Sequence, residues 1–235
     1  MNYDIIQTGS DGNATVIDDK ILIDCGVAYK KLEHYIPELR LVLLTHEHSD
    51  HFRKSTVRRI AKERPALRWA CRHWMVPALV EAGVDKRNID VLSPDCWYTV
   101  CWDTFGENAV KISPFDTIHD APNCGWRIWR GQQDSIFYAT DLRSLGGIEA
   151  KGYGVYLLEA NYREADLQDR LNEKLDAGEF AYETRAQFTH LSWEQAMEWL
   201  KENMAKYSVW VPMHQHKERE TNDGREENAI QEDNG

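Results

Sequence analysis

Short apolar segments bounded by polar turns dominate the first two thirds of this 235-residue chain. Residues 14–18 and 20–24 predict a hairpin that turns at Asp18 and Asp19. The apolar run within residues 39–45 predicts a buried strand. Further short strands are predicted at residues 88–92, 97–102, 109–112, 126–130, 135–139, 154–159 and 209–212.

Helices are predicted between and after these strands. Residues 52–63 form a helical pattern with one basic face, residues 74–82 a short helix that ends at Gly83, and residues 163–175 a third helix. Ser192 and Gln195 form a capping box, which begins a helix predicted to run to about Tyr207. This order indicates an α/β (α+β) fold of two sheets with helices outside them, and not a doubly wound parallel sheet.

Composition fits one globular domain, with 42% hydrophobic and 29% charged residues. No apolar run approaches the ~20 residues that span a bilayer. The N-terminal residues lack the basic start and apolar stretch of a secretory signal. The five cysteines are odd in number and form no C-x-x-C motif, which is typical of reduced thiols. We therefore expect a soluble, cytoplasmic protein with no membrane partner.

Charge is distributed unevenly around a net value of -11. Residues 217–235 carry seven acidic and three basic side chains, so they predict a solvated, disordered tail after a domain at residues 1–216. Residues 52–72 carry eight basic side chains and one acid. The net charge disfavours a nucleic-acid partner, whereas this basic run could steer a phosphate backbone. A solvated helix face is the alternative explanation.

The strongest chemical signal is His46-Glu47-His48-Ser49-Asp50-His51, directly after the predicted strand at residues 39–45. Three imidazoles and a carboxylate at a strand end would each need a partner if buried. A loop that folds back can aim them at metal ions. Imidazole suits zinc, iron, nickel and copper, and carboxylate adds affinity for manganese or magnesium.

This segment resembles the H-x-H-x-D-H metal motif of the metallo-β-lactamase fold. Other landmarks of that family follow in the expected order. The stretch at residues 21–26 resembles the early strand that ends in Asp-x-Gly, and His119, Asp141 and His214 resemble the later metal-binding residues. The resemblance covers residues 8–216 and implies a four-layer αββα sandwich.

Four further segments resemble the YycJ/WalJ-like branch of that family. They are Gly9–Ala14, which is similar to its S-x-G-N-A/S start, residues 119–125 (H-D-A…P…G), residues 159–162 (E-x-N-H/Y) and residues 190–192 (H-L-S). Asp11 replaces a common second serine, and Met213-His214-Gln215-His216 matches no fixed motif of the branch. The activity of the branch implies a DNA exonuclease that acts from 5′ ends.

The resemblance also implies the ligands of two divalent metal ions, zinc or manganese. His46, His48 and His119 would hold one ion, Asp50, His51 and His214 the other, and Asp141 would bridge them. His216 is the alternative to His214, which is favoured because it lies closer to the strand. The two ions would deprotonate a water to give the attacking hydroxide. Asp50 or Asp141 would accept or orient its proton.

The other candidate residues each have a structural alternative. Asp24 could orient a metal histidine or simply cap backbone amides. His190 could donate a proton to the scissile phosphate or leaving oxygen, or could be a structural histidine before the Ser192 cap. Asn161 could bind substrate or hold the metal loops. Lys54 and Arg58 share one face of the basic helix and could bind a polynucleotide.

The leading hypothesis is a metal-dependent phosphodiesterase, with DNA as the favoured substrate and partner. A small-molecule hydrolase of the same fold, for a cyclic phosphodiester, thioester or lactone, is the second. The basic helix favours the first and the net charge the second. A non-catalytic nucleic-acid-binding or scaffold module is the third, but it would have no need for seven metal-binding side chains.

Overall fold

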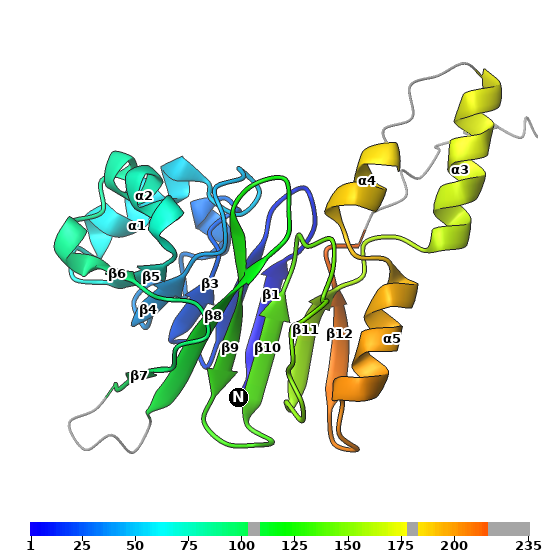
Figure 1. The fold of residues 1–235 in the computed structure, drawn as a ribbon. Helices are drawn as coiled ribbons and strands as arrows, with labels where there is room; N and C mark the ends of the chain where they lie inside the picture. Colours follow the sequence, from blue (N-terminus) through cyan, green and yellow to red (C-terminus); the bar gives the residue numbers. More distant parts are fainter. Residues whose placement is uncertain (103–108, 178–182, 216–235) are drawn as a thin grey trace, which may run out of the picture.

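A computed structural model describes residues 1–102, 109–177 and 183–215, and the predicted tail at 217–235 lies outside this range. Its centre is a pair of six-stranded sheets (Figure 1). The first sheet has the order β1-β2-β3-β4-β5-β6, with antiparallel pairs up to β3 and parallel pairs after it. Its strands are β1 (Tyr3–Gln7), β2 (Ala14–Ile17), β3 (Ile21–Ile23), β4 (Leu41–Leu43), β5 (Arg68–Cys71) and β6 (Ile89–Val91).

The second sheet has the order β12-β11-β10-β9-β8-β7. Strands β10, β11 and β12 are parallel, and the pairs β10/β9, β9/β8 and β8/β7 are antiparallel. The strands are β7 (Tyr98–Val100), β8 (Val110–Thr117), β9 (Asn123–Trp129), β10 (Ser135–Ala139), β11 (Val155–Glu159) and β12 (Val209–Met213). Strand β8 therefore runs in the same direction as β10–β12, and the carboxyl ends of all four strands lie at one edge.

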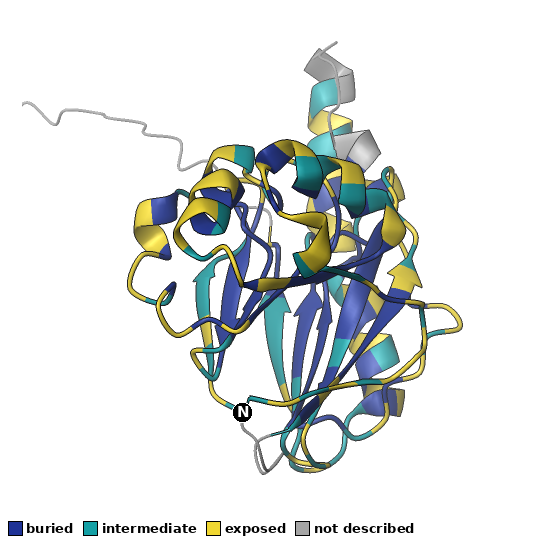
Figure 2. Ribbon diagram, turned by 90° about the vertical axis from the view of Figure 1, so that its left-hand side faces the viewer, coloured by how far each residue is buried: buried dark blue, intermediate teal, exposed yellow. Residues whose placement is uncertain are grey.

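The sheets pack face to face over an apolar core. Alternate residues of β3 and β4, such as Ile23 and Leu43, meet Trp126, Ile136 and Leu157 of the second sheet. Inward and outward alternation along each strand places the remaining apolar side chains on the outer faces, where helices cover them. In Figure 2 the strands of both sheets are mainly buried, and the outward faces of the helices are exposed.

Helices form the two outer layers. On the first sheet, α1 (Lys54–Glu63) and α2 (Val76–Ala82) bury Val57, Ile60 and Leu79 against the outer face. On the second sheet, α5 (Trp193–Asn203) buries Ala196 and Leu200 beside Phe137 and Tyr156. Short 3-10 turns η1 (Tyr29–Lys31), η2 (His73–Met75) and η3 (Lys86–Asn88) complete the first half. The predicted four-layer αββα sandwich is confirmed.

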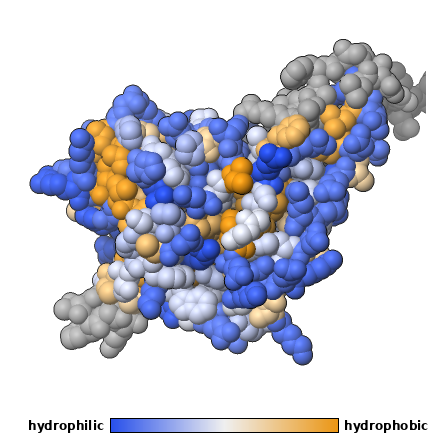
Figure 3. Space-filling model, viewed as in Figure 1, coloured by the Kyte–Doolittle hydropathy of each residue, from blue (hydrophilic) through white to orange (hydrophobic). Residues whose placement is uncertain are grey.

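Two further helices stand beside the sandwich. Helices α3 (Glu164–Ala177) and α4 (Glu183–Thr189) lie past the end of β11 and project from the body in Figure 1. Leu167 of α3 and Ala186 of α4 are buried together with Tyr162, so a small apolar cluster fixes the two helices against the chain before α3. Figure 3 shows a largely hydrophilic face, with apolar surface gathered over α1 and α2.

The structure corrects some of the predicted elements. β1, β5 and α4 were not predicted, and β8 extends five residues beyond the predicted strand at 109–112, as far as Thr117. Helix α5 ends at Asn203, not near Tyr207, because Met204 is extended (ψ 138°) and Asn203 donates its side-chain amide to the Trp199 carbonyl. Among the described helices, none combines the length and the apolarity that crossing a bilayer requires.

Candidate metal centre

The loop at residues 46–51 follows β4 and is held by backbone hydrogen bonds. The amides of His51 and Phe52 donate to the His48 carbonyl at 2.9 and 2.7 Å, which closes the turn. The Cys25 amide donates to the His51 carbonyl at 2.8 Å. Gly26 passes so close that a Cβ there would lie 1.6 Å from the Asp50 carbonyl oxygen. The chain after β3 therefore fixes the position of the histidine loop.

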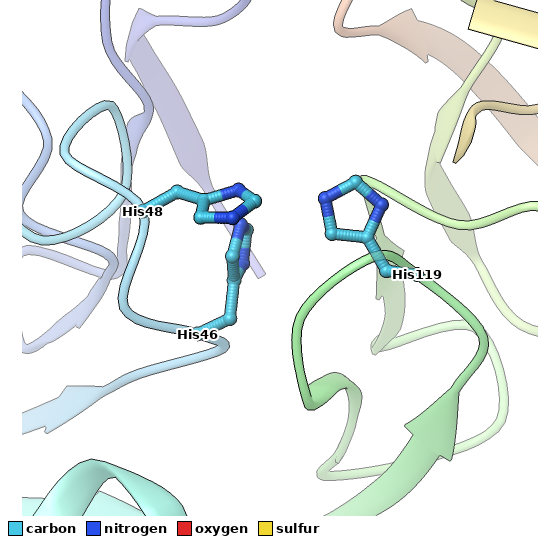
Figure 4. A group of neighbouring side chains, drawn as sticks. All are labelled: His46, His48 and His119. Atoms are coloured by element: carbon cyan, nitrogen blue, oxygen red, sulfur yellow. The ribbon is translucent and has the colours of Figure 1, made fainter. Parts of the chain in front are cut away.

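A first group of side chains consists of His46, His48 and His119. The first two come from the loop after β4 and His119 from the turn after β8, so they face each other across the two sheets (Figure 4). One ligand atom of each lies within 4.8 Å of the others. The Nε2 atoms of His46 and His119 are buried and make no hydrogen bond to the described residues, although Asp120 Oδ1 lies 3.1 Å from the latter.

A second group consists of Asp50, His51 and His214. Asp50 Oδ2 lies 3.6 Å from His51 Nε2 and 3.7 Å from His214 Nε2. The Nε2 atom of His214 is buried and has no hydrogen-bond partner among the described residues. These distances are too long for direct hydrogen bonds, and three atoms converge on one point. Such a convergence is what a metal ion requires of its ligands.

Asp141 lies between the two groups. Its Oδ2 is 2.7 Å from His51 Nε2, and its Oδ1 is 3.5 Å from His214 Nε2 and 3.9 Å from His119 Nε2. It is therefore close to members of both groups, and the family resemblance implies a bridging role for it.

Three residues of this region have left-handed backbone. Asp24, Asp141 and His214 have φ values of 60°, 56° and 51°, and each comes within two residues of the end of a strand. Such a conformation is unfavourable for residues other than glycine. This left-handed backbone turns each of the three side chains across the end of the sheets. The unfavourable conformation therefore occurs where the site is assembled.

Polar partners fix the orientation of the histidine rings. His51 Nδ1 donates to Asp24 Oδ2 at 2.7 Å, and His46 Nδ1 lies 3.0 Å from Thr45 Oγ1, which itself donates to Asp24. His119 Nδ1 donates to the Thr189 carbonyl at 3.0 Å. With Nδ1 engaged, each ring directs Nε2 toward the group, as metal-binding histidines do. Asp24 therefore contacts a histidine and also accepts the Thr45 backbone amide at 3.0 Å, so the structure shows both of its predicted roles.

Glu159 is a buried residue that the sequence analysis did not assign to the site. Its Oε1 lies 2.7 Å from His190 Nδ1 and 3.3 Å from His214 Nδ1, and its Oε2 accepts the Leu142 amide at 2.9 Å. The signal that could have found it is a carboxylate at the end of an apolar strand, in the quoted segment at residues 159–162.

Two opposing effects determine the pKa values in the site. Burial disfavours the charged form of a side chain, and a nearby opposite charge favours it. Burial lowers the pKa of His46 well below its ordinary value. For His51 burial acts in the same direction, but the Asp141 and Asp24 carboxylates overcome it and raise the pKa to about 10. Burial alone would raise the pKa of Asp141, whereas His214 and His51 hold it well below the usual range.

The residues fit a pair of divalent ions. The buried, unpartnered Nε2 atoms point into the space between the two groups, and buried polar atoms without partners call for a ligand. The donor set is imidazole nitrogen and carboxylate oxygen without thiolate, which suits zinc or manganese.

Of the other residues predicted for the site, some line the cavity of this centre and some do not. His190 and Asn161 line the same cavity, of about 200 Å³, with His48, Asp50 and Asp141. Asn161 donates its amide to the His214 carbonyl at 2.7 Å, so it holds the loop after β12. Lys54 and Arg58 do not line the cavity, and Lys54 pairs with Glu81. His216 lies outside the described residues.

A sandwich of two mixed sheets with a histidine- and aspartate-rich centre at the strand ends defines a metallo-β-lactamase fold protein. The chain matches the family described as "Beta-lactamase superfamily domain" over residues 19–214, and it belongs to that family. Together with the side-chain groups, this membership identifies a metal-dependent hydrolase of that superfamily. No curated protein sequence matches the chain.

Solved structures share the fold at low sequence identity. The chain is similar to human tRNase Z, short form, with a TM-score of 0.63 and 15% identity over 92% of this chain and 93% of that one. It is similar to the metallo-β-lactamase fold protein YhfI from Bacillus subtilis, with a TM-score of 0.64 and 18% identity over 91% and 85%. It is also similar to a long-form RNase Z from yeast, with a TM-score of 0.58 and 13% identity. That match covers 93% of this chain and 38% of the yeast chain.

Proposed function

We propose that the protein is a metal-dependent phosphodiesterase that removes nucleotides from the 5′ ends of DNA. The observation that carries the proposal is the gathering of imidazole and carboxylate side chains, without thiolate, at the ends of strands of both sheets. The segments that resemble the YycJ/WalJ-like branch support DNA exonuclease activity. Two of the similar structures are RNase Z proteins, which supports a phosphodiester substrate.

In this proposal the ligands divide as the two groups do. His46, His48 and His119 would hold one ion, Asp50, His51 and His214 would hold the second, and Asp141 would serve both. When bound, the ions supply a nucleophile at neutral pH and offset charge on the phosphate. Asp50 or Asp141 accepts or orients the proton of the attacking group, because both residues line the cavity.

His190 is the proposed proton donor. It lines the cavity, with Nδ1 2.7 Å from Glu159 Oε1 and 3.7 Å from Asp141 Oδ1. Burial lowers its pKa, but the Glu159 carboxylate outweighs burial and raises it above the ordinary value. A protonated imidazole held at the cavity wall is suited to donate to the leaving oxygen.

The second candidate is a hydrolase of a small phosphodiester, thioester or lactone. The observation in its favour is the cavity volume of about 200 Å³, together with the position of Lys54 and Arg58 outside the cavity lining. A small substrate would fit this volume without contacts along α1.

The test is a nuclease assay on end-labelled linear duplex DNA, with manganese or zinc and with 5′-phosphate or 5′-hydroxyl ends. We expect mononucleotides released from the 5′ end, and none from Asp50→Ala. Protein that holds two metal ions per chain but cleaves neither DNA would contradict the proposal and favour the small substrate.

A further inference from the structure

A second hollow adjoins the cavity of the metal centre. The two share Asn161, Tyr162, Arg170 and Gln215 in their lining. The second hollow has a volume of about 220 Å³, and its other lining residues are Ala160, Arg163, Asp166 and Trp193. A substrate group that extends from the metal centre into the second hollow would therefore pass these four residues, of which Arg170 is the cation.

Arg170 is the single arginine or lysine among the described residues that line the metal cavity. Its Nε is buried and has no hydrogen-bond partner in the described part of the chain. A buried guanidinium nitrogen without an acceptor is unfavourable, and it indicates an acceptor that the protein does not itself supply. Three carboxylates, those of Asp50, Asp120 and Asp141, line the same cavity, and no hydrogen bond joins any of them to Arg170 Nε.

Packing fixes the face of α3 that carries Arg170. Leu167 lies one turn earlier on the same face and is buried against Tyr162 and Ala186. The guanidinium is therefore directed toward the cavities by the apolar cluster beneath it. A planar guanidinium in this position matches the oxygen atoms of a phosphate group better than an ammonium would.

The second hollow carries a further cation and an aromatic ring. The Arg163 guanidinium lies 4.4 Å from the centroid of the Trp193 ring. With Arg170, this places two guanidinium groups and one carboxylate, that of Asp166, around a small space beside the metal centre. In contrast, several basic residues of the 52–72 run form ion pairs, as in Lys54–Glu81, Arg68–Asp90 and Arg72–Asp116.

We propose that Arg170, supported by Arg163, binds a second phosphate group of the substrate next to the phosphate that is hydrolysed. The proposal rests on the proposed phosphodiesterase function, because that function places the first phosphate at the metal centre. The ligand class is a nucleotide or oligonucleotide with two phosphate groups.

The test compares a ligand with two phosphates and a ligand with one. Thymidine 3′,5′-bisphosphate and thymidine 5′-monophosphate are titrated by calorimetry into metal-loaded wild type, Arg170→Gln, Arg170→Lys and Arg87→Gln. Arg87 is exposed, pairs with Asp85 and lines neither cavity, so it is the control. We expect Arg170→Gln to lose about 10- to 100-fold in affinity for the bisphosphate, as for a charged hydrogen bond.

The monophosphate affinity should fall less than the bisphosphate affinity in Arg170→Gln, since one phosphate occupies the metal centre alone. Hydrolysis of bis(p-nitrophenyl) phosphate should be unchanged in the control Arg87→Gln, which lines neither cavity. Arg170→Lys should keep part of the preference for the bisphosphate over the monophosphate. This partial preference would show that the loss of bisphosphate affinity in Arg170→Gln does not come from misfolding. Equal bisphosphate affinity in wild type and Arg170→Gln overturns the subsite, even if DNA is cleaved. Arg170-dependent bisphosphate binding in a protein that cleaves no DNA upholds the subsite and counts against the exonuclease.

Discussion

Asp24 shows how a single buried side chain can control several others at the metal centre. It accepts hydrogen bonds from the Thr45 amide and hydroxyl and contacts Nδ1 of His51 at 2.7 Å. Thr45 Oγ1 in turn contacts His46 Nδ1. One carboxylate thus orients a histidine in each of the two ligand groups.

Asp24→Asn should weaken metal binding about 10- to 100-fold, because an amide is a poorer partner for the His51 ring and for the Thr45 donors. The measurement is a competition titration with a chelator. Asp4→Asn is the matched control, since Asp4 pairs with Tyr35 at the exposed surface. An unchanged affinity in Asp24→Asn would mean that Asp24 acts only as a backbone cap.

Metal uptake should release at least one proton per chain at pH 8. The pKa of His51 is raised to about 10, so the ring is protonated in the metal-free protein, whereas a metal ion binds neutral imidazole. Apparent metal affinity should therefore rise about tenfold per pH unit between pH 7 and 9. Calorimetry in two buffers of different ionisation enthalpy measures the protons.

A rise in pH should have opposite effects on metal binding and on folding: it strengthens metal binding and weakens the metal-free fold. Because the pKa of His51 is raised, its ion pairs stabilise the metal-free fold fully below the ordinary histidine value and lose this effect as pH rises through about 10. Metal uptake without proton release at pH 8 would show that His51 is neutral before the metal binds.

At the level of residues, local motifs were predictable and partners distant in sequence were not. The six-residue motif at 46–51 is contiguous, and the structure brings its histidines together with His119 and His214. The contacts of Glu159 with His190 and His214 span 31 and 55 residues, so no local pattern marks them. The partner of His119 is the Thr189 carbonyl, which no side-chain identity can reveal.

The loop after β4 depends, as an element, on the chain segment after β3. Gly26 is the closest point, and its hydrogen atom occupies space that no side chain could share with the Asp50 carbonyl. The Cys25 carbonyl also accepts the Arg53 amide at 3.0 Å, at the start of α1. Direct contacts therefore hold the two segments against each other.

Gly26→Ala should displace residues 50–51 and remove metal binding at the second ligand group, because the added Cβ would lie 1.6 Å from the Asp50 carbonyl oxygen. Gly131→Ala is the control, since its Cβ would meet nothing closer than 4.0 Å. Metal content per chain and the melting temperature are measured for both. Two bound ions in Gly26→Ala would show that the loop tolerates the shift.

The elements that sequence patterns missed have specific causes. Strand β5 (Arg68–Cys71) is short and lies within the basic run, where its charged first residue hides the apolar alternation. Helix α4 buries Ala186 and the polar Thr189 and exposes Phe188, so its apolar residues in the sequence do not mark its buried face. In contrast, β4 is fully buried and its apolar run was a sufficient signal.

The whole molecule has a net charge of -11, although residues 52–72 are locally basic. Arg59 pairs with Glu63 and Glu33, and Arg64 donates to the Ile36, Pro37 and Leu39 carbonyls. Much of the basic run is therefore structural. Arg58 is exposed on α1 and stays a predicted contact for a long substrate only.

Arg58→Glu should weaken binding of long DNA about threefold to tenfold and reduce its salt dependence by roughly one phosphate contact. Hydrolysis of bis(p-nitrophenyl) phosphate should not change, because Arg58 lies outside the cavity. Arg87→Glu is the control for net charge. Identical salt dependence in the two variants would remove α1 from the substrate path.

Thiol reactivity should report how completely the two sheets are closed. Cys25, Cys71 and Cys124 are buried, and burial raises the pKa of Cys71 to about 12, whereas Cys96 and Cys101 are exposed. At pH 8 we expect two thiols to react rapidly with a disulfide reagent in the native protein and all five in denaturant. Rapid reaction of more than two would indicate frequent opening of the core.

The division of the metal centre between the two sheets has a consequence for how the protein matures. The loop at residues 46–51 belongs to the first half of the sandwich, whereas His119, Asp141 and His214 follow strands of the second. During synthesis the early ligands leave the ribosome while their counterparts are still untranslated. A complete pair of ions could therefore be held only after β12 has been added, whereas the group of His46, His48 and His119 is complete once the turn after β8 has been made.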